Sequence, residues 1–130
     1  MIFAKLASRQ PYVLSLLRIV AGFCLSLHGF QKFFGVLGGR RAAAGSLVWF
    51  AGVLECFGGT LVFLGLFTRS VAFILSGEMA VAYFYRHLPK GFWPILNGGE
   101  LAAIYAFAYL YLAAAGGGPW TVGRLWRGLD

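Results

Sequence analysis

A chain of 130 residues has room for one domain. Its composition excludes an ordinary soluble domain, because 60% of the residues are hydrophobic and only 12% are charged, against about 25% charged residues in typical soluble domains. The net charge of +7 does not indicate nucleic-acid binding, since the basic residues are spread between apolar segments and termini instead of forming one patch.

Four apolar segments approach the length needed to cross a bilayer, which is about 20 residues for a helix. Glycines, prolines and charged residues separate them, as in the loops of membrane proteins. The sequence therefore predicts an all-α integral membrane protein, a bundle of four transmembrane helices forming a single domain over residues 1–130. The predicted helices cover residues 11–33, 45–67, 69–85 and 98–115.

The first predicted helix, residues 11–33, begins at Pro11, which suits a first helical turn. It contains small residues at Gly22 and Gly29, and the second predicted helix, residues 45–67, is also rich in glycine. Small residues allow helix backbones to approach closely in lipid. We therefore expect these two helices to pack tightly against each other.

Charged residues inside the predicted helices are the strongest indication of a site. Glu55 and Glu78 fall near the middles of the second and third helices, and Arg18 lies in the first. An unpaired charge at the bilayer centre costs about 2.5–3.5 kcal/mol on insertion scales. With a rise of 1.5 Å per residue, all three charges fall within about 6 Å of the midplane. We expect Arg18 to pair with one or both glutamates.

Two interpretations of this cluster stay open. It either only fixes the register of the helices, or it forms a proton or electron-coupling site or a pocket for a quinone head group. A second polar cluster is expected nearer the opposite face, where Lys32 follows His28 by one helical turn, Glu100 opens the fourth helix and Tyr105 lies about one and a half turns further in. Asn97 and Glu100 also fit a capping box, with Asn97 as N-cap; capping and site roles are compatible.

The sequence contains no recognisable motif for metal binding or for catalysis. Cys24 and Cys56 are interpreted as small buried hydrophobic residues, with a redox pair as the alternative if the first two helices bring them together. Haem ligation by His28 and His87 is set aside, because His87 falls in or near a loop. No three-ligand metal set, Ser-His-Asp arrangement or phosphate loop is present. No catalytic residue and no metal site are therefore assigned.

The tail and the loops bear on membrane placement. Residues 119–130 contain two tryptophans and two arginines, which predicts a short segment at the membrane interface. Four spans place both termini on one side, but counting basic residues does not orient the chain. The terminal side carries Lys5, Arg9, Arg69, Arg124 and Arg127, and the other side carries Lys32, Arg40, Arg41, Arg86 and Lys90.

At these residues the chain resembles the DoxX family of small bacterial and archaeal membrane proteins. The resemblance covers about residues 12–115, and it implies four helices in the cytoplasmic membrane with both termini in the cytoplasm. The stretches that carry it are Leu17-Arg18, His28-Gly29-Phe30-Gln31-Lys32, Gly52-Val53-Leu54-Glu55-Cys56-Phe57-Gly58-Gly59, Gly65-Leu66-Phe67-Thr68-Arg69, Glu78-Met79 and Gly91-Phe92-Trp93-Pro94-Ile95-Leu96-Asn97-Gly98-Gly99-Glu100.

The resemblance implies a subunit associated with redox chemistry, because the family is linked to quinol oxidase, to thiosulfate:quinone oxidoreduction and to thiol stress. The expected partners are the lipid bilayer, a redox partner protein and further copies of the chain, with quinone as the expected ligand. The alternative is a membrane scaffold or an assembly module without chemistry. A transporter ranks last, because the sequence shows no inverted repeat.

Overall fold

The computed structural model describes residues 1–126 and 129, and all regular secondary structure in that part of the chain is helical. Two π-helical turns, Leu54–Gly58 and Tyr83–His87, continue helices without a break, and Leu88–Lys90 and Gly123–Leu125 are short 3₁₀ turns. The α-helices are α1 (Ile2–Ser8), α2 (Gln10–Phe34), α3 (Leu47–Val53), α4 (Gly59–Leu64), α5 (Thr68–Ala82), α6 (Pro94–Asn97) and α7 (Glu100–Ala115).

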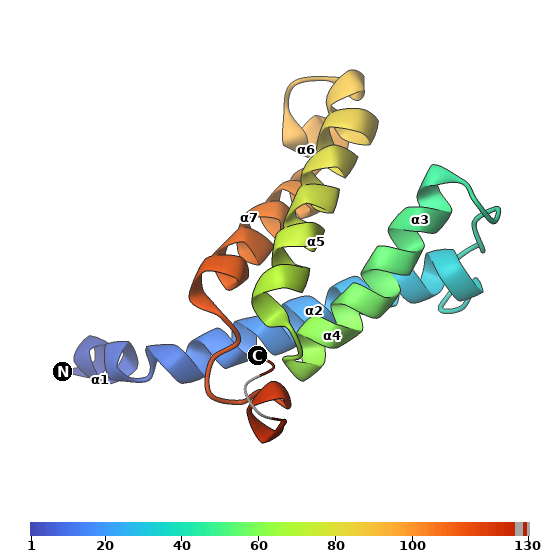
Figure 1. The fold of residues 1–130 in the computed structure, drawn as a ribbon. Helices are drawn as coiled ribbons and strands as arrows, with labels where there is room; N and C mark the ends of the chain where they lie inside the picture. The colour runs from blue at the N-terminus through green and yellow to red at the C-terminus, as the bar shows by residue number, and fades with distance from the viewer. Residues whose placement is uncertain (127–128, 130) are drawn as a thin grey trace.

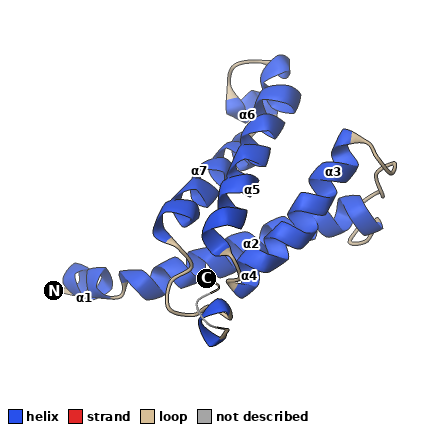
Figure 2. Cartoon of the chain, in the orientation of Figure 1, coloured by secondary structure: helices blue, strands red, loops and turns tan. Residues whose placement is uncertain are grey.

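The helices form two antiparallel hairpins that diverge from a common end (Figure 1). In the first hairpin, α2 packs against a continuous helix, Leu47–Leu64, made of α3, the first π-helical turn and α4. We call it the α3–α4 helix. In the second hairpin, α5 packs against α7. The hairpins meet where α4 turns into α5, which we call the closed end, and the loops lie at the tips of the helices (Figure 2).

Glycine contacts hold the first hairpin together, as the sequence predicts. A Cβ atom on Gly29 would lie 2.0 Å from the backbone nitrogen of Cys56, and one on Gly22 would lie 2.4 Å from that of Phe63. A Cβ atom on Gly59 would lie 2.7 Å from the backbone nitrogen of Ser26. Only glycine permits such approach of two backbones. The predicted tight packing of the first two helices is therefore confirmed.

The hydrophobic core lies near the closed end, between the two hairpins. Tyr109 of α7 is fully buried there, and its hydroxyl donates to the carbonyl oxygen of Ala21 on α2 at 2.7 Å. Within the second hairpin, Ser76 Oγ donates to the carbonyl oxygen of Ala106 at 2.7 Å. The buried apolar side chains of this core include Leu25, Val62, Ala72, Leu75 and Leu112.

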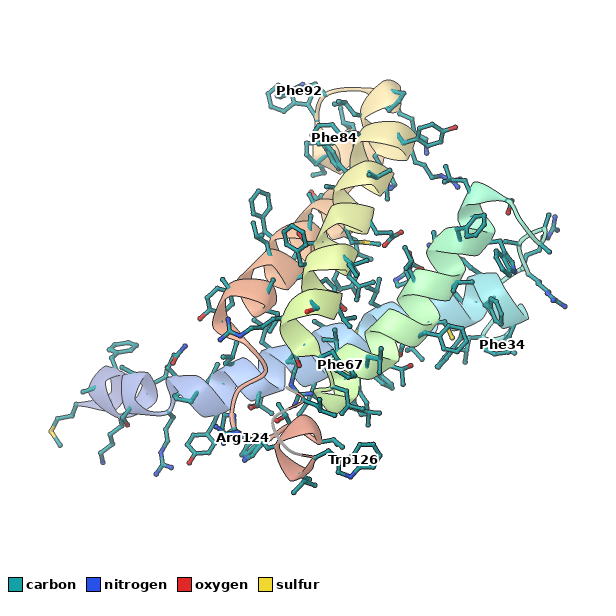
Figure 3. The ribbon with its side chains drawn as sticks, in the orientation of Figure 1. Phe34, Phe67, Phe84, Phe92, Arg124 and Trp126 are labelled. Atoms are coloured by element: carbon teal, nitrogen blue, oxygen red, sulfur yellow. The ribbon has the colours of Figure 1, made fainter. Side chains whose placement is uncertain are left out.

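Large apolar side chains cover much of the outer surface. Figure 3 shows Phe34 at the far tip of the first hairpin, Phe84 and Phe92 at the far tip of the second, and Phe67 at the closed end. All four are roughly half exposed or more. By length and apolar composition, α2 and the α3–α4 helix are each able to cross a membrane, while α7 is apolar but shorter. The all-helical prediction is confirmed, and the number of spans stays a prediction.

The boundary between the second and third predicted helices differs from the expectation. The α4 helix ends at Leu64 and the turn occupies residues 65–67, so the second helix ends three residues before the predicted residue 67. Gly65 ends α4 in the left-handed region with φ of 77°, which favours glycine. Thr68 is buried and begins α5. Sequence patterns place helix ends less accurately than helices, and α1 was not predicted at all.

The segment after α7 folds back against the closed end. The backbone nitrogen of Val122 donates to the carbonyl oxygen of Leu64 at 2.9 Å, and that of Gly123 donates to Gly65 at 3.1 Å. Thr121 is buried in this contact. Arg127 lies outside the described residues, and the interfacial position of the tail stays a prediction. In the part that is described, the tail packs against the turn between α4 and α5 and is hydrogen-bonded to it.

Candidate functional site

Arg18 does not pair with a glutamate, so the expected Arg18–Glu cluster is wrong. The side chain is 1% exposed and donates only to backbone carbonyl oxygens in the bonds that the structure describes. Nη1 donates to Val62 at 2.8 Å and to Phe63 at 2.5 Å, both in the last turn of α4. Nε donates to Gly117 at 3.0 Å, and Nη2 donates to Trp120. The guanidinium thus binds the C-terminal end of one helix and the segment that follows another.

The register of the first hairpin explains this correction. Close contacts pair Gly29 with Cys56 and Gly22 with Phe63, so each step forward along α2 is a step back along α4. The same register places Arg18 beside the end of α4. Glu55 lies beside the region of Lys32 instead, fourteen residues further along α2, which is about 21 Å of helix. The depth estimate failed because it centred each helix on the midplane separately.

The end of α4 is a good partner for a buried cation. Carbonyl groups in the last turn of a helix have no intrahelical donor, and the helix dipole places partial negative charge there. Arg69 repeats the arrangement at the surface, where Nη1 donates to Ala113 at 3.3 Å and to Ala114, and Nη2 donates to Ala115 at 3.4 Å, at the end of α7. Two arginines therefore cap two helix ends at the closed end of the molecule.

Glu55 pairs with Lys32, which the sequence analysis had placed in the other cluster. Lys32 Nζ donates to Oε1 of Glu55 at 2.6 Å and to Oε2 at 2.7 Å. The Glu55 side chain is 2% exposed, whereas that of Lys32 is 32% exposed. The ammonium therefore satisfies both oxygens of a buried carboxylate. The glycine register contained the signal for this pair, because it aligns residue 32 of α2 with the turn before Glu55.

A π-helical turn positions Glu55 in this pair. Leu54–Gly58 forms the turn, and its backbone at Glu55 and Cys56 touches Gly29 of α2. π-helical turns insert one extra residue into a helix and occur frequently at functional sites. The second π-helical turn, Tyr83–His87, ends α5 on the other side of the same space. Both irregular turns therefore face the gap between the hairpins.

A cleft of about 700 Å³ lies between the two hairpins. Lys32, Glu55 and Glu78 all contribute to its lining, together with His28 and Tyr105. The rings of His28 and Tyr105 meet edge to face, with centroids 6.4 Å apart. Five residues of the two expected clusters thus form one polar floor.

The walls of the cleft are mostly apolar and lie on both hairpins. Phe50 and Leu54 from the first hairpin are 55% and 40% exposed, and Ile74 and Val81 of α5 are 54% and 60% exposed. At the second π-helical turn, three residues with polar side chains also line the cleft; they are Tyr85, Arg86 and His87. The sequence analysis placed His87 in or near a loop, and it missed that this turn brings Tyr85, Arg86 and His87 to the cleft.

Glu78 differs from Glu55 in that one of its two oxygens has no hydrogen-bond donor in the described part of the chain. Its carboxyl group interacts with that of Glu55, including through a side-chain hydrogen bond, and with the ammonium of Lys32. Its Oε2 atom is buried, yet it accepts no hydrogen bond from any residue that the structure describes. Buried carboxylate oxygens are nearly always hydrogen-bonded in proteins. The floor of the cleft therefore holds one carboxyl group with both oxygens hydrogen-bonded to Lys32 and one with a buried oxygen that has no donor among the described residues.

Glu100 and Asn97 do not join this floor. Glu100 is exposed, is absent from the cleft lining and is the first residue of α7, so the capping box with Glu100 at N3 is wrong. The N-cap of α7 is Gly99, and Asn97 Oδ1 accepts from the backbone nitrogen of Gly99 at 2.8 Å. Asn97 is buried, and its Nδ2 donates to the carbonyl oxygen of Gly91 at 2.9 Å. Its role here is to fold the loop.

The cysteines and histidines are not arranged as a metal site in the part of the chain that the structure describes. Cys24 and Cys56 are both free thiols, and Cys56 is buried as expected for a small hydrophobic residue. His87 Nδ1 lies 3.2 Å from the carbonyl oxygen of Asn97. Among the described residues, no group of three or more His, Cys, Asp or Glu side chains is arranged to hold a metal ion. The chemistry of the cleft is therefore that of Lys32, Glu55, Glu78, His28 and Tyr105.

Comparison with known proteins places the chain in a family. The DoxX family profile matches residues 13–88, which is more than half of the chain and includes Lys32, Glu55 and Glu78. An uncharacterized protein of Haemophilus influenzae is 47% identical over 121 residues, an alignment that covers 88% of this chain and 90% of that protein. No solved structure matches the chain significantly. The chain is therefore a membrane protein of the DoxX family.

Proposed function

We propose that this protein is a multi-pass subunit of the bacterial or archaeal cytoplasmic membrane that serves a redox complex by binding a quinone in the cleft. In this proposal α2, the α3–α4 helix, α5 and α7 cross the membrane, with both termini in the cytoplasm. A partner protein carries the redox centre, and the cleft holds the quinone beside it. The observation that carries the proposal is a cleft with apolar walls and a charged floor.

The shape and chemistry of the cleft fit an amphipathic ring compound. Sites for small molecules are mostly apolar concave spaces of about 300–1,000 Å³ with a few placed polar groups. The cleft, at about 700 Å³, lies within that range. A quinone presents polar oxygens on a ring that is otherwise apolar and that carries an apolar chain. The polar oxygens suit the floor, and the ring and chain suit walls such as those at Phe50 and Ile74.

The floor residues have separable roles in this proposal. Lys32 is the cation of the floor, and Glu55 holds its ammonium with two short hydrogen bonds. His28 and Tyr105 supply an aromatic edge beside it. Lys32, with about a third of its side chain exposed, remains accessible from the cleft. Glu55 is thus a positioning residue, and Lys32 is the group that touches the ligand.

Ligand binding with matched glutamate variants tests the proposal. Glu55→Gln keeps the size of the side chain but removes the charge that holds Lys32, and we expect it to weaken binding of a short-chain quinone to the purified protein about tenfold. Glu100→Gln makes the same chemical change at an exposed position outside the cleft and should leave affinity unchanged. Absence of binding to the unmodified protein, or equal affinity in both variants, would contradict the proposal.

A membrane scaffold or assembly module is the second candidate, and the Lys32–Glu55 pair gives it specific support. The pair joins α2 to the α3–α4 helix directly beside the backbone contact at Gly29. A pair in that position stabilises the hairpin whether or not a ligand binds. In a scaffold, Glu55→Gln lowers thermal stability but leaves the proteins that co-purify from native membranes unchanged. Loss of a redox partner in that experiment would favour the first function instead.

A further inference from the structure

A second cavity, of about 460 Å³, lies at the closed end, between the start of α2 and the segment that follows α7. Its walls differ from those of the cleft, because they contain two arginines, Arg69 and Arg124, and three consecutive glycines, residues 116–118. Arg124 lies at this end of the molecule in Figure 3. None of the described residues that line the cavity is acidic. The cavity therefore has the sign of charge that an anion-binding site needs.

The glycine segment supplies hydrogen-bond donors to the cavity. Gly117 is buried, yet neither its backbone nitrogen nor that of Gly118 donates to any atom of the described residues. Buried N–H groups without an acceptor are rare, and successive backbone N–H groups in a turn form anion-binding sites. Gly118 has φ of 76°, and a Cβ atom there would lie 2.3 Å from Oγ of Ser15. The segment is thus fixed in a shape that leaves two donors unused beside the cavity.

Arg69 brings positive charge to the edge of this segment. Its Nη2 atom lies 3.4 Å from the carbonyl oxygen of Ala115, and a Cβ atom on Gly116 would lie 3.2 Å from the same nitrogen. The guanidinium offsets the partial negative charge at the end of α7, which would otherwise repel an anion. Arg69 is exposed, and a guanidinium has five N–H donors that can bind phosphate oxygens in pairs. It is therefore suited to bind an anion in the cavity.

The surroundings of the cavity match the head-group region of a membrane. Tyr12 and Trp120 directly follow two lining residues in the chain, and their rings pack together with centroids 5.4 Å apart. The guanidinium carbon of Arg9 lies 5.9 Å from the centre of the Tyr12 ring. Tyrosine and tryptophan are enriched at membrane interfaces, and basic pockets between transmembrane helices bind lipid head groups. Further along α2, Leu17 and Val20 are exposed apolar side chains on which acyl chains can pack.

We propose that this cavity binds the phosphate group of an anionic phospholipid such as phosphatidylglycerol. The two arginines and the unused backbone N–H groups of the glycine segment hold the phosphate. A lipid fits better than free phosphate, because Leu14 adds an apolar side to the cavity. The inference does not depend on the proposed function, since the cavity shares no lining residue with the cleft. Bound there, the lipid joins the start of α2 to α5 and to the segment after α7.

Lipid binding to the purified protein in a neutral detergent tests the inference. Native mass spectrometry compares phosphatidylglycerol with phosphatidylcholine of the same acyl chains, and we expect the anionic lipid to bind about fivefold more tightly or better. Equal binding of the two lipids would overturn the proposal. Displacement of phosphatidylglycerol by inorganic phosphate at equal concentration would overturn the lipid as the occupant. No quinone is present, so neither result bears on the proposed function.

Arginine variants assign the binding to this cavity. Arg69→Gln removes the charge and should weaken phosphatidylglycerol binding about fivefold, whereas Arg69→Lys keeps the charge but not the paired donors and should lie between. Arg124→Gln tests the other arginine of the cavity and should also weaken binding. Arg40→Gln is the matched control, because Arg40 is an exposed arginine in the loop after α2, outside the cavity. Equal losses at residues 69 and 40, or no loss in both cavity variants, would overturn the site.

Discussion

The closed end and the cleft differ in how completely their buried charged groups are hydrogen-bonded. At the closed end, the guanidinium of Arg18 makes four hydrogen bonds to carbonyl oxygens drawn from α4 and the segment after α7. In the cleft, Glu78 has a buried oxygen with no hydrogen bond from the described residues. A fully satisfied charge rigidifies the structure around it, whereas an unsatisfied one is retained where something else binds. In the proposed function, the closed end stabilises the fold and the cleft binds the ligand.

Removing Arg18 tests this comparison with the largest expected effect. Arg18→Ala removes a donor from the carbonyl groups of Val62, Phe63 and Trp120, while Gly117 keeps a bond from Ser15. We expect the free energy of unfolding to fall by about 3–5 kcal/mol, because each buried carbonyl group left without a donor costs about 1–3 kcal/mol. Denaturation in detergent, followed by circular dichroism, measures the change. Arg18→Lys keeps the charge but has a single ammonium group as donor. The stability of this variant should therefore lie between those of the unmodified protein and Arg18→Ala.

A stability loss below about 1 kcal/mol for Arg18→Ala would break the comparison, because such small losses are typical of surface charges. Quinone affinity provides a second criterion. Arg18 is absent from the cleft lining. Affinity in the folded fraction should therefore be unchanged, and a selective loss of affinity would show that the two ends are coupled.

Gly29→Ala is expected to have the next largest effect, and it acts on the cleft through the backbone. The new Cβ atom would lie 2.0 Å from the backbone nitrogen of Cys56, so the two helices have to separate. Overpacking of this kind lowers stability by about 1–3 kcal/mol. The shift also moves Glu55 away from Lys32, so quinone binding should weaken as well. Thermal denaturation and the binding assay measure both effects on the same preparation.

Gly77→Ala is the matched control for the stability measurement. Gly77 is also a helical glycine, but a Cβ atom there meets no atom within 4 Å. Replacing glycine with alanine inside a helix stabilises it by about 0.5–1 kcal/mol. The same substitution should therefore have opposite signs at the two positions. Equal destabilisation by both would mean that the contact at Gly29 is not the cause.

Arg69→Ala sharpens the comparison with the smallest expected effect. Arg69 caps the end of α7 as Arg18 caps the end of α4, but it is exposed to solvent. A surface charge at a helix end contributes about 0.3–1 kcal/mol. We expect Arg69→Ala to lower the free energy of unfolding by no more than that. A loss as large as that of Arg18→Ala would show that burial does not explain the difference between the two arginines.

The sequence predicts the helices and the family better than it predicts the partners of its charges. The apolar segments and the glycines, prolines and charges between them locate α2, the α3–α4 helix, α5 and α7 to within a few residues. The family assignment holds, as does the tight contact through Gly22 and Gly29. These features depend on local composition and on steric size. Both can be read from residue types without knowledge of the register.

The candidate site was predicted only in part, because sequence reasoning pairs side chains with side chains. Arg18 instead donates to backbone carbonyl groups at the end of α4. Every residue has such a carbonyl group, so residue types do not indicate which ones bind a side chain. Lys32 was identified, but its partner Glu55 depends on the register between two antiparallel helices. Glu100 has a charge in the right part of the sequence but faces outward. Three-dimensional placement, not composition, decided each of these outcomes.

Because Glu55 lies in the π-helical turn Leu54–Gly58, the direction of its side chain depends on the number of residues in the turn as well as on their identity. An α-helix advances about 100° per residue, since it has 3.6 residues per turn. Deleting one residue from the turn would restore an ordinary α-helix. The side chains before the turn would then be rotated by about 100° around the helix axis relative to those after it. Lineages that lost a single codon here would keep every charged side chain and yet lose the alignment of Glu55 with Lys32.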